Sequence, residues 1–270
     1  MSNQKYLLTS ANSHSGFSNK VHAWANAYYL AQQNSMIIVQ DWTGDSDAIS
    51  LPNTISISTL EKDIEWSLFD TNSLKNSDIL PDNQFIKLTC GFNYNRYFFS
   101  KINHKALFQQ ISFNHPCYSD IVELCRDPNL VGVHIRRSDF YPPTLTDYDF
   151  VGINSQVHEK WFVSVMKDLK KINDNVRFYI ATENPDNFIH LRNKFNIVDR
   201  NIFNIPLDKR PPQNYVLCLQ DFVDLFVLTH AKCFIETPRS SYSHLASLMS
   251  KNSSITSTTY SGYFYHSRNY

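Results

Sequence analysis

The sequence predicts an α/β protein made of two Rossmann-like halves. Short apolar runs with strand character alternate with amphipathic helices through most of the chain, as in parallel sheets covered by helices. No internal repeat or low-complexity linker separates the halves, so we expect them to share a cleft. The length of 270 residues and the 42% hydrophobic content are sufficient for a buried core.

The first half, residues 1–125, begins with a predicted strand, a helix and a second strand. Apolar residues at helical spacing from Val21 to Ala31 predict a helix that ends near Gln33. The other elements expected in this half are strands at 6–9, 36–40, 54–58 and 85–89, a helix at 59–68, and a mostly helical stretch at 103–125 that Pro116 interrupts.

The second half, residues 126–252, shows the clearer alternation. Its expected elements are strand 131–136, an irregular loop at 141–154, helix 155–172, strand 176–181, a short helix at 185–195, helix 213–230, strand 232–235 and helix 240–249. Residues 253–270 form a tail rich in Ser, Thr and Tyr, which we expect to cross back onto the first half.

Composition excludes several classes of protein. The 25 basic and 25 acidic residues balance, which disfavours a nucleic-acid partner. The five cysteines are odd in number and form no CxxC pair, so we expect reduced thiols rather than a zinc site or disulfides. No signal peptide is visible, and no apolar run reaches the ~20 residues of a membrane span. We therefore expect a cytoplasmic protein without a transmembrane segment.

The strand at 131–136 is the centre of the predicted site because it ends in a cluster of charge, made by His134, Arg136, Arg137 and Asp139. Ligands of open α/β sheets bind at the carboxyl ends of strands, and Arg grips phosphate with a planar fork of donors. Strand alternation puts His134 and Arg136 on one face, toward a diphosphate, and leaves Arg137 to brace Asp139. The alternatives are that the arginines form structural ion pairs and that the histidine is a core residue whose hydrogen bonds are made within the protein.

Asp224 lies on the otherwise apolar helix expected at 213–230. A carboxylate is expensive to bury unpaired, so it either faces solvent or holds a ligand. A buried carboxylate can accept hydrogen bonds from N1 and N2 of guanine, a pair of donors that adenine and uracil cannot present. Asp221, about one helical turn earlier, competes for this role.

The turn at 237–241 joins a predicted strand to the last predicted helix. Ser240 or Ser241 is a plausible N-cap of that helix. Backbone N–H groups and a hydroxyl at a helix N-terminus form an anion site, although ordinary capping explains the same residues.

Two Asp-x-Asp triplets raise the question of a metal on a nucleotide diphosphate. They are Asp45 with Asp47, which has the chemistry of a turn, and Asp147 with Asp149. The triplet is common by chance, and we expect a metal at neither. The absence of GxGxxG, P-loop and GxSxG motifs disfavours dehydrogenases, P-loop NTPases and serine esterases.

Three motifs in order resemble the GDP-fucose-dependent fucosyltransferases, a superfamily that includes α1,2-, α1,6- and protein O-fucosyltransferases. The first family motif, His-x-Arg-Arg-x-Asp, matches residues 134–139. The second, a strand that ends in Ala-Thr-Asp-Asp-Pro, matches residues 181–185. The third, an Asp on an apolar helix before a strand and a Ser-Ser turn, matches Asp224 with Ser240 and Ser241. Residues 16–19 are weakly similar to the family's Gly-x-x-Asn turn.

The resemblance implies a GT-B-like architecture, with two Rossmann-like lobes that face a central cleft and the donor on the second lobe. It implies that Arg136 holds the β-phosphate and stabilises the departing GDP without a metal or other cofactor. His134 and Asp224 would contact guanine, Ser240 the diphosphate, and Asn19 the acceptor side of the cleft. The implied reaction moves fucose, with inversion, to a hydroxyl of a glycan or lipo-oligosaccharide, and a lipid-linked acceptor would bring the protein to a membrane surface.

Two departures from the family pattern leave parts of this prediction open. Core α1,6 enzymes carry a Lys directly after the motif Asp and a catalytic Glu five residues after it, where this chain has Phe140 and Thr144. The expected general base is therefore Asp139, Asp147, Asp149 or Glu183, or no residue at all. Glu-Asn in the second motif leaves room for another GDP-sugar. The rival functions are a transferase for a different nucleotide sugar and a non-catalytic glycan-binding or scaffold protein.

Overall fold

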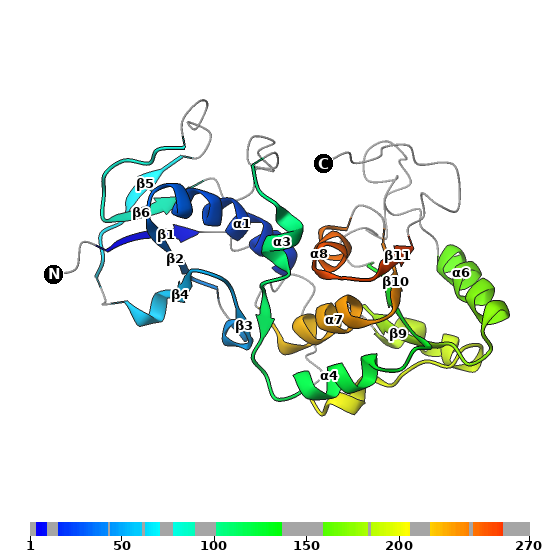
Figure 1. The fold of residues 1–270 in the computed structure, drawn as a ribbon. Coiled ribbons are helices and arrows are strands. Elements are labelled where there is room, and N and C mark those ends of the chain that lie inside the picture. Colours follow the sequence, from blue (N-terminus) through cyan, green and yellow to red (C-terminus); the bar gives the residue numbers. More distant parts are fainter. Residues whose placement is uncertain are drawn as a thin grey trace, which may run out of the picture. The chain divides into compact units, whose positions relative to one another are not determined.

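A computed structural model describes ten segments of the chain (Figure 1). They are residues 4–9, 16–42, 44–60, 63–70, 78–89, 101–136, 159–182, 185–205, 217–237 and 240–255. The described residues form two compact units. Unit 1 contains those between 4 and 114 together with 217–219, and unit 2 contains those between 115 and 205 together with 220–255.

Unit 1 is built on a five-stranded parallel sheet with the strand order β4-β2-β1-β6-β5. The strands are β1 (Lys5–Thr9), β2 (Met36–Gln40), β4 (Thr54–Ser56), β5 (Ser67–Phe69) and β6 (Phe85–Leu88). β1 and β2 run in register from their first residues to Thr9 and Gln40, so their carboxyl ends lie side by side.

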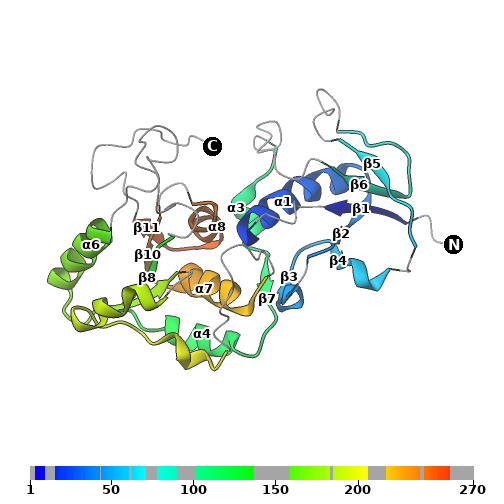
Figure 2. The same ribbon diagram turned by 180° about the vertical axis from the view of Figure 1, so that it is seen from behind.

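Helix α1 (Phe17–Gln33) covers one face of this sheet (Figures 1 and 2). The Trp24 indole donates a hydrogen bond from Nε1 to Oγ1 of Thr54 at 2.8 Å, which identifies the covered face. Thr54 is the register partner of Ile38. Since side chains alternate along a strand, Ile38 and Gln40 both point toward α1.

The smaller elements of unit 1 complete it. They are η1 (Ser46–Ala48), β3 (Ile49–Ser50), η2 (Ile57–Thr59), α3 (His104–Phe108) and β7 (Ser112–Phe113), with β3 and β7 paired antiparallel. Leu217 belongs to this unit because it forms a parallel bridge with Gly44.

Unit 2 is built on a four-stranded parallel sheet with the strand order β11-β10-β8-β9. Its strands are β8 (Leu130–His134), β9 (Arg177–Ala181), β10 (Cys233–Ile235) and β11 (Ser253–Ile255). Its helices are α4 (Tyr118–Cys125), α6 (Glu159–Ile172), η4 (Pro185–Asn193), η5 (Arg200–Phe203), α7 (Leu219–His230, whose first residue belongs to unit 1) and α8 (Ser241–Met249).

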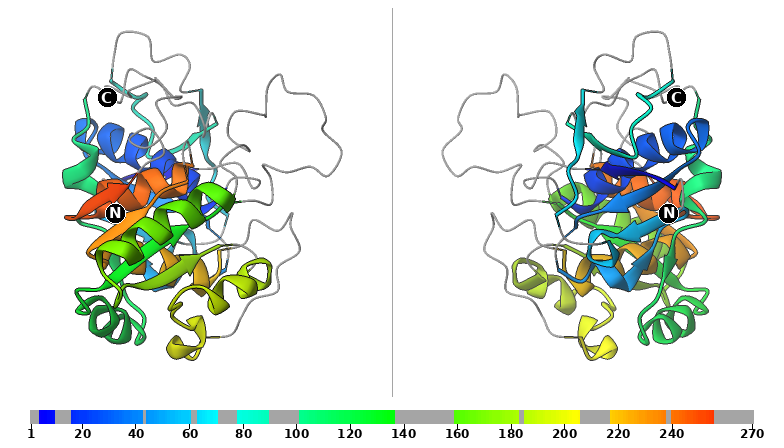
Figure 3. Two further views of the ribbon diagram at one scale, coloured as in Figure 1. Left: turned by 90° about the vertical axis from the view of Figure 1, so that its right-hand side faces the viewer. Right: turned by 90° about the vertical axis from the view of Figure 1, so that its left-hand side faces the viewer.

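The two faces of the second sheet are covered by different helices (Figures 1 and 3). On one face, Val131, Val133 and Ile135 pack in a buried cluster with residues of α6 such as Phe162 and Met166. On the other face, a Cβ at Gly132 would lie 2.7 Å from Cδ2 of Leu228 on α7. Gly132 therefore allows α7 to pack closely against β8.

Three predicted elements differ from the structure, and the stretch expected to be mostly helical at 103–125 also contains strand β7 between α3 and α4. The helix expected at 59–68 is wrong: Ile57–Thr59 is a 3₁₀ turn and Ser67–Phe69 a strand at the edge of the sheet. The short helix expected at 185–195 is a 3₁₀ helix, Pro185–Asn193. The helix expected at 213–230 begins at Leu219 in the described part of the chain. The remaining strands and long helices lie within a few residues of their predicted bounds.

The predicted division of the chain also differs from the two units. Helix α4 belongs to unit 2 rather than to the first half, and residues 217–219 belong to unit 1. Residues 253–255, the start of the expected tail, form β11. This strand pairs with β10 and so belongs to the sheet of unit 2. Residues 256–270 lie outside the described residues.

Candidate functional site

The carboxyl ends of β8, β9 and β10 form one polar edge of unit 2. His134 at the end of β8 pairs in register with Ala181 at the end of β9, and Val133 pairs with Ile235 at the end of β10. The strands therefore stop together, and the residues that follow them share one side of the sheet. This is the edge at which open α/β sheets bind ligands.

Thr237 fixes the backbone from which Arg136 projects. Its hydroxyl donates to the His134 carbonyl at 2.6 Å, and the same oxygen accepts the Arg136 N–H at 3.1 Å. One side chain from the segment after β10 thus continues the hydrogen bonding of β8 beyond its last residue. Arg136 is only partly buried, so a ligand in solvent can reach it.

His134 is buried and neutral at the same edge. Its Nδ1 lies 2.7 Å from Oγ of Ser243, and its ring packs against Tyr242 with centroids 4.9 Å apart. Burial, and then the charge of Arg136, lower the pKa of His134 to about 3. The alternation predicted for this strand is confirmed, because His134 faces α8 while Val133 faces the α6 cluster.

The contact between His134 and Ser243 is compatible with either tautomer of the imidazole. The Ser243 hydroxyl oxygen accepts the Thr237 N–H at 3.0 Å. In the tautomer adopted below, the Ser243 hydroxyl donates to Nδ1 of His134 and the ring proton lies on Nε2. Nε2–H has no hydrogen-bond partner among the described residues and is a donor for a ligand.

The turn before α8 caps that helix. Ser240 is its N-cap, and the Ser240 hydroxyl oxygen accepts the Ser243 N–H at 3.5 Å. Ser241 is the first residue of the helix and is partly exposed. Capping is thus confirmed, and the partial positive charge of the helix N-terminus lies at the polar edge.

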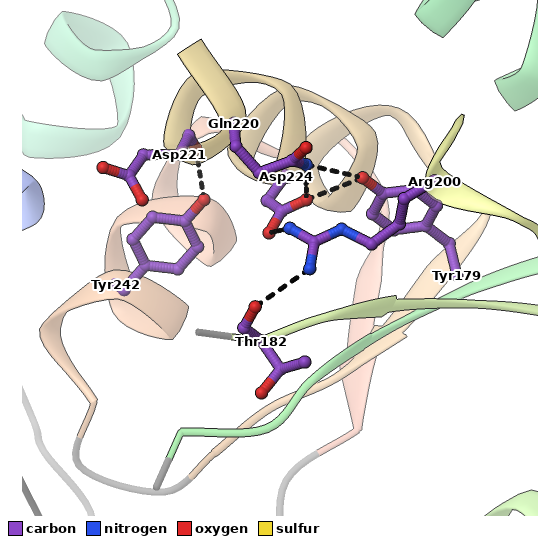
Figure 4. A network of polar contacts seen from close by, with 7 residues as sticks. All are labelled: Tyr179, Thr182, Arg200, Gln220, Asp221, Asp224 and Tyr242. Carbon is purple, nitrogen blue, oxygen red and sulfur yellow. Dashed lines mark hydrogen bonds and ion pairs between the residues drawn. The ribbon is translucent and has the colours of Figure 1, made fainter. Parts of the chain in front are cut away.

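Asp224 lies at the centre of a buried polar network (Figure 4). It is 6% exposed, so the solvent-facing alternative is wrong. Its Oδ1 accepts hydrogen bonds from the Tyr179 hydroxyl and from Nε2 of Gln220, both at 2.6 Å. Its Oδ2 pairs with the Arg200 guanidinium, which also donates to the Thr182 carbonyl at 3.0 Å. The carboxylate is buried because three donors compensate its charge.

The electrostatics of this network favour an ion pair. Burial opposes the charge of Arg200, but the Asp224 carboxylate outweighs burial and raises the pKa of the guanidinium. Arg200 is therefore charged at every pH at which the protein is folded. The Tyr179 pKa is raised by burial and by Asp224, so the phenol stays a donor.

Asp221 lies one turn before Asp224 but outside the network. Figure 4 shows its carboxylate directed away from Arg200, beside the ring of Tyr242. The Tyr242 hydroxyl donates to the Asp221 backbone carbonyl. Tyr242 therefore contacts both His134 and α7, and Asp221 is partly exposed.

The other predicted site residues are placed as follows. Asn19 lies in the first turn of α1 in unit 1 and is partly exposed. Arg137, Asp139 and Glu183 lie outside the described residues, as do Phe140, Thr144, Asp147 and Asp149.

In the triplet at Asp45 and Asp47, the first carboxylate binds a backbone N–H group. Oδ2 of Asp45 accepts the Leu219 N–H at 2.6 Å, and Asp47 is exposed in η1. Within the described segments, no group of three His, Cys, Asp or Glu residues is arranged to hold a metal ion. No helix in those segments is long and apolar enough to cross a membrane.

Sequence reasoning missed the residues that hold this edge together, namely Tyr179, Arg200, Gln220, Thr237 and Ser243. Gln220 precedes Asp224 by four residues on a predicted helix, a spacing that could have identified the pair. Arg200 lies in an irregular segment, and no local pattern connects it to Asp224.

Comparison with known proteins finds solved structures that have a similar fold. No protein family model matches the chain, and no curated protein matches it in sequence. The solved structure of NodZ α1,6-fucosyltransferase soaked with GDP-fucose is 12% identical, with a TM-score of 0.53 over 92% of this chain and 93% of that chain.

Two further structures agree. NodZ fucosyltransferase from Bradyrhizobium is 12% identical, with a TM-score of 0.56 over 92% of each chain. POFUT1 in complex with GDP-fucose is 8% identical, with a TM-score of 0.61 over 94% of this chain and 98% of that chain. The chain therefore has the mixed α/β, parallel-sheet fold of these GT-B fucosyltransferases, as the sequence predicted.

Proposed function

We propose that this protein is a fucosyltransferase that takes fucose from GDP-fucose. The observation that carries the proposal is the edge of unit 2, where Arg136, neutral His134 and the capped N-terminus of α8 follow strands that end together. This arrangement supplies a cation, a neutral donor and a positive helix end to one ligand. The same fold is found in NodZ soaked with GDP-fucose and in POFUT1 in complex with GDP-fucose.

Arg136 binds the diphosphate in this proposal. During transfer, the acceptor hydroxyl oxygen forms a bond to the anomeric carbon of fucose, and the bond from that carbon to the β-phosphate oxygen breaks. The electron pair stays on GDP and the proton of the acceptor hydroxyl leaves to a base or to water, so negative charge grows on the phosphate that Arg136 contacts. A preorganised cation stabilises such charge by a few kcal/mol, and no metal is needed for this role.

His134 and a carboxylate on α7 select guanine. The Nε2–H of His134 donates to the O6 acceptor of guanine, which adenine replaces with a donor. We place the partner carboxylate at Asp221 rather than Asp224. Oδ1 of Asp224 already accepts two hydrogen bonds and Oδ2 pairs with Arg200, so too few lone pairs remain for both N1 and N2 of guanine.

The acceptor is proposed to be a hydroxyl of a glycan or lipo-oligosaccharide, and transfer to proceed with inversion. Incubation with GDP-fucose and a panel of glycan acceptors should release GDP in the presence of EDTA. Arg136→Ala should lower the rate by about 10²-fold or more. Arg126→Ala is a matched control, because Arg126 is exposed on the same unit and pairs with Glu123. GDP binding without turnover on any acceptor would favour a scaffold protein, and turnover of a different nucleotide sugar would favour the rival transferase.

A further inference from the structure

The carboxyl edge of the first sheet contains buried polar atoms that have no hydrogen-bond partner in the described segments. In unit 1, Oγ1 of Thr9, Oε1 of Gln40 and Nε1 of Trp42 are buried and form no hydrogen bond in the described part of the chain. Thr9 is 3% exposed, and Gln40 and Trp42 are each 7% exposed. A buried polar atom without a partner costs about 1–3 kcal/mol, so three at one place call for an explanation.

These atoms belong to one corner of unit 1. Thr9 and Gln40 are register partners at the ends of β1 and β2, and both point toward α1. Trp42 follows two residues later, and its ring packs edge-on against Phe17 in the first turn of α1, with centroids 6.4 Å apart. The corner is thus bounded by two strand ends and the start of a 17-residue helix.

Two ionisable groups complete the corner. Lys20 in the first turn of α1 is buried, and burial lowers its pKa although Asp41 opposes this shift. Asp41 lies between Gln40 and Trp42, and burial raises its pKa against the effects of Lys87 and Lys20. Asp41 is the partly exposed member, so a ligand can reach its carboxylate from solvent.

We propose that this corner, made by Thr9, Gln40, Asp41 and Trp42, binds hydroxyl groups of a sugar. Sugar hydroxyls both donate and accept, and the corner offers both kinds of partner. The indole N–H donates, the amide and carboxylate oxygens accept, and the threonine hydroxyl does either. The proposal rests on the proposed function, for which it supplies the sugar-binding residues of unit 1.

An anion fits the corner less well than a sugar. Two of the polar groups, the Gln40 amide oxygen and the Asp41 carboxylate, are acceptors and would repel phosphate or sulfate. A neutral ligand also agrees with the charges of the corner, where one buried cation, Lys20, is balanced by one carboxylate, Asp41. An internal water molecule is the alternative explanation for unpaired buried atoms, and the experiment must separate the two.

The indole N–H groups of the four tryptophans provide the readout. In ¹⁵N–¹H spectra of the full chain, Trp42→Phe and Trp24→Phe assign the two relevant signals. Free disaccharides of glucose, galactose and N-acetylglucosamine are then titrated to high millimolar concentration. At least one should shift the Trp42 signal with saturation, while the Trp24 signal stays in place because its N–H is already bonded to Thr54.

Substitutions in the corner should then weaken that titration. Gln40→Leu and Asp41→Asn should each raise the dissociation constant of the disaccharide about tenfold or more. The GDP affinity of the same variants, measured in parallel, should equal that of the wild type because their residues lie in unit 1. Thr54→Val is the matched control, since Thr54 lies on the same face of the sheet but has its partner.

Two results would overturn the proposal. One is a protein that binds GDP but shows no shift of the Trp42 signal with any disaccharide, which would remove the sugar site and leave the proposed function intact. The other is a lower melting temperature for Thr9→Val and Gln40→Leu with an unchanged disaccharide titration, which would identify an internal water. A disaccharide shift without GDP binding would keep the sugar site and remove the proposed donor.

Discussion

The two sheets of this protein have the same parallel construction but differ in how the polar groups at their carboxyl edges are compensated. In unit 2, the Asp224 carboxylate accepts from three donors, on Tyr179, Arg200 and Gln220, although Nε of Arg200 and Oε1 of Gln220 are buried without a partner among the described residues. In unit 1, atoms of Gln40 and Trp42 are buried without partners among the described residues. The Asp224 network is a frame that holds the polar edge of unit 2 in shape, whereas the corner of unit 1 has hydrogen-bonding groups that the proposed sugar would complete.

The largest expected effect comes from breaking the frame. Arg200→Met should lower the free energy of unfolding by about 3–5 kcal/mol, because it leaves the Asp224 charge buried without its counter-ion. Urea denaturation followed by circular dichroism measures this change.

Arg177→Met is the matched control for the frame. Arg177 pairs with Asp127 near the surface of the same unit, with 39% of its side chain exposed, and such a pair contributes at most about 1 kcal/mol. Equal losses for the two variants would mean that Asp224 does not depend on Arg200.

A pH titration tests the burial of His134. The folded protein resists protonation of His134 down to a pKa of about 3, whereas the unfolded chain takes up this proton below about pH 6.5. The unfolded state binds more protons in this window, so the free energy of unfolding should fall with decreasing pH, by up to about 1.4 kcal/mol per pH unit.

His134→Gln removes this titration and should show a shallower loss of stability between pH 6.5 and pH 5. The free energies of unfolding of the two proteins are compared at each pH, so that the contributions of carboxylates present in both proteins cancel. Parallel curves for wild type and variant would show that His134 is accessible to protons in the folded state.

Thr237→Val tests the connection between β10 and Arg136. The variant keeps the shape of the side chain but loses the hydrogen bonds to the His134 carbonyl and the Arg136 N–H. We expect a loss of about 1–3 kcal/mol in the free energy of unfolding and weaker GDP binding. Thr229→Val, which removes the contacts of a hydroxyl with the Phe226 carbonyl and with Nδ1 of His230 away from this edge, should lower stability without changing GDP binding.

The smallest effect is expected in unit 1. Gln40→Leu removes a buried amide oxygen that has no hydrogen-bond partner among the described residues, so the free energy of unfolding without ligand should change by less than about 1 kcal/mol or increase. Thermal unfolding of the ligand-free protein measures this difference. A loss comparable to that of Thr237→Val would show that the Gln40 amide is already satisfied and that the two edges are alike.

Much of the fold follows from local pattern. The parallel strands and the helices α1, α6, α7 and α8 are visible in the sequence because apolar spacing records which side of each element is buried. The helix expected at 59–68 does not form. The apolar periodicity of this stretch is weak, and part of it forms β5, a three-residue edge strand that is stabilised by pairing with β6.

The site follows from the sequence only in part. His134 lies at the predicted strand end and Ser240 at the predicted cap because strand alternation and capping are local. Asp224 was singled out correctly as a costly carboxylate, but its partner Arg200 lies in an irregular segment and meets it only in the folded chain. Contacts of this kind are set by tertiary packing, which a single sequence does not encode in any local pattern.

Calorimetric titration of this chain with GDP, in EDTA, is the sharpest test of the proposed nucleotide site. We expect GDP to bind and UDP not to bind. We also expect Arg136→Ala to weaken GDP binding about tenfold or more and the exposed Arg126→Ala to leave it unchanged. Absence of GDP binding, or equal affinities for wild type and Arg136→Ala, would contradict a nucleotide-diphosphate site at the end of β8.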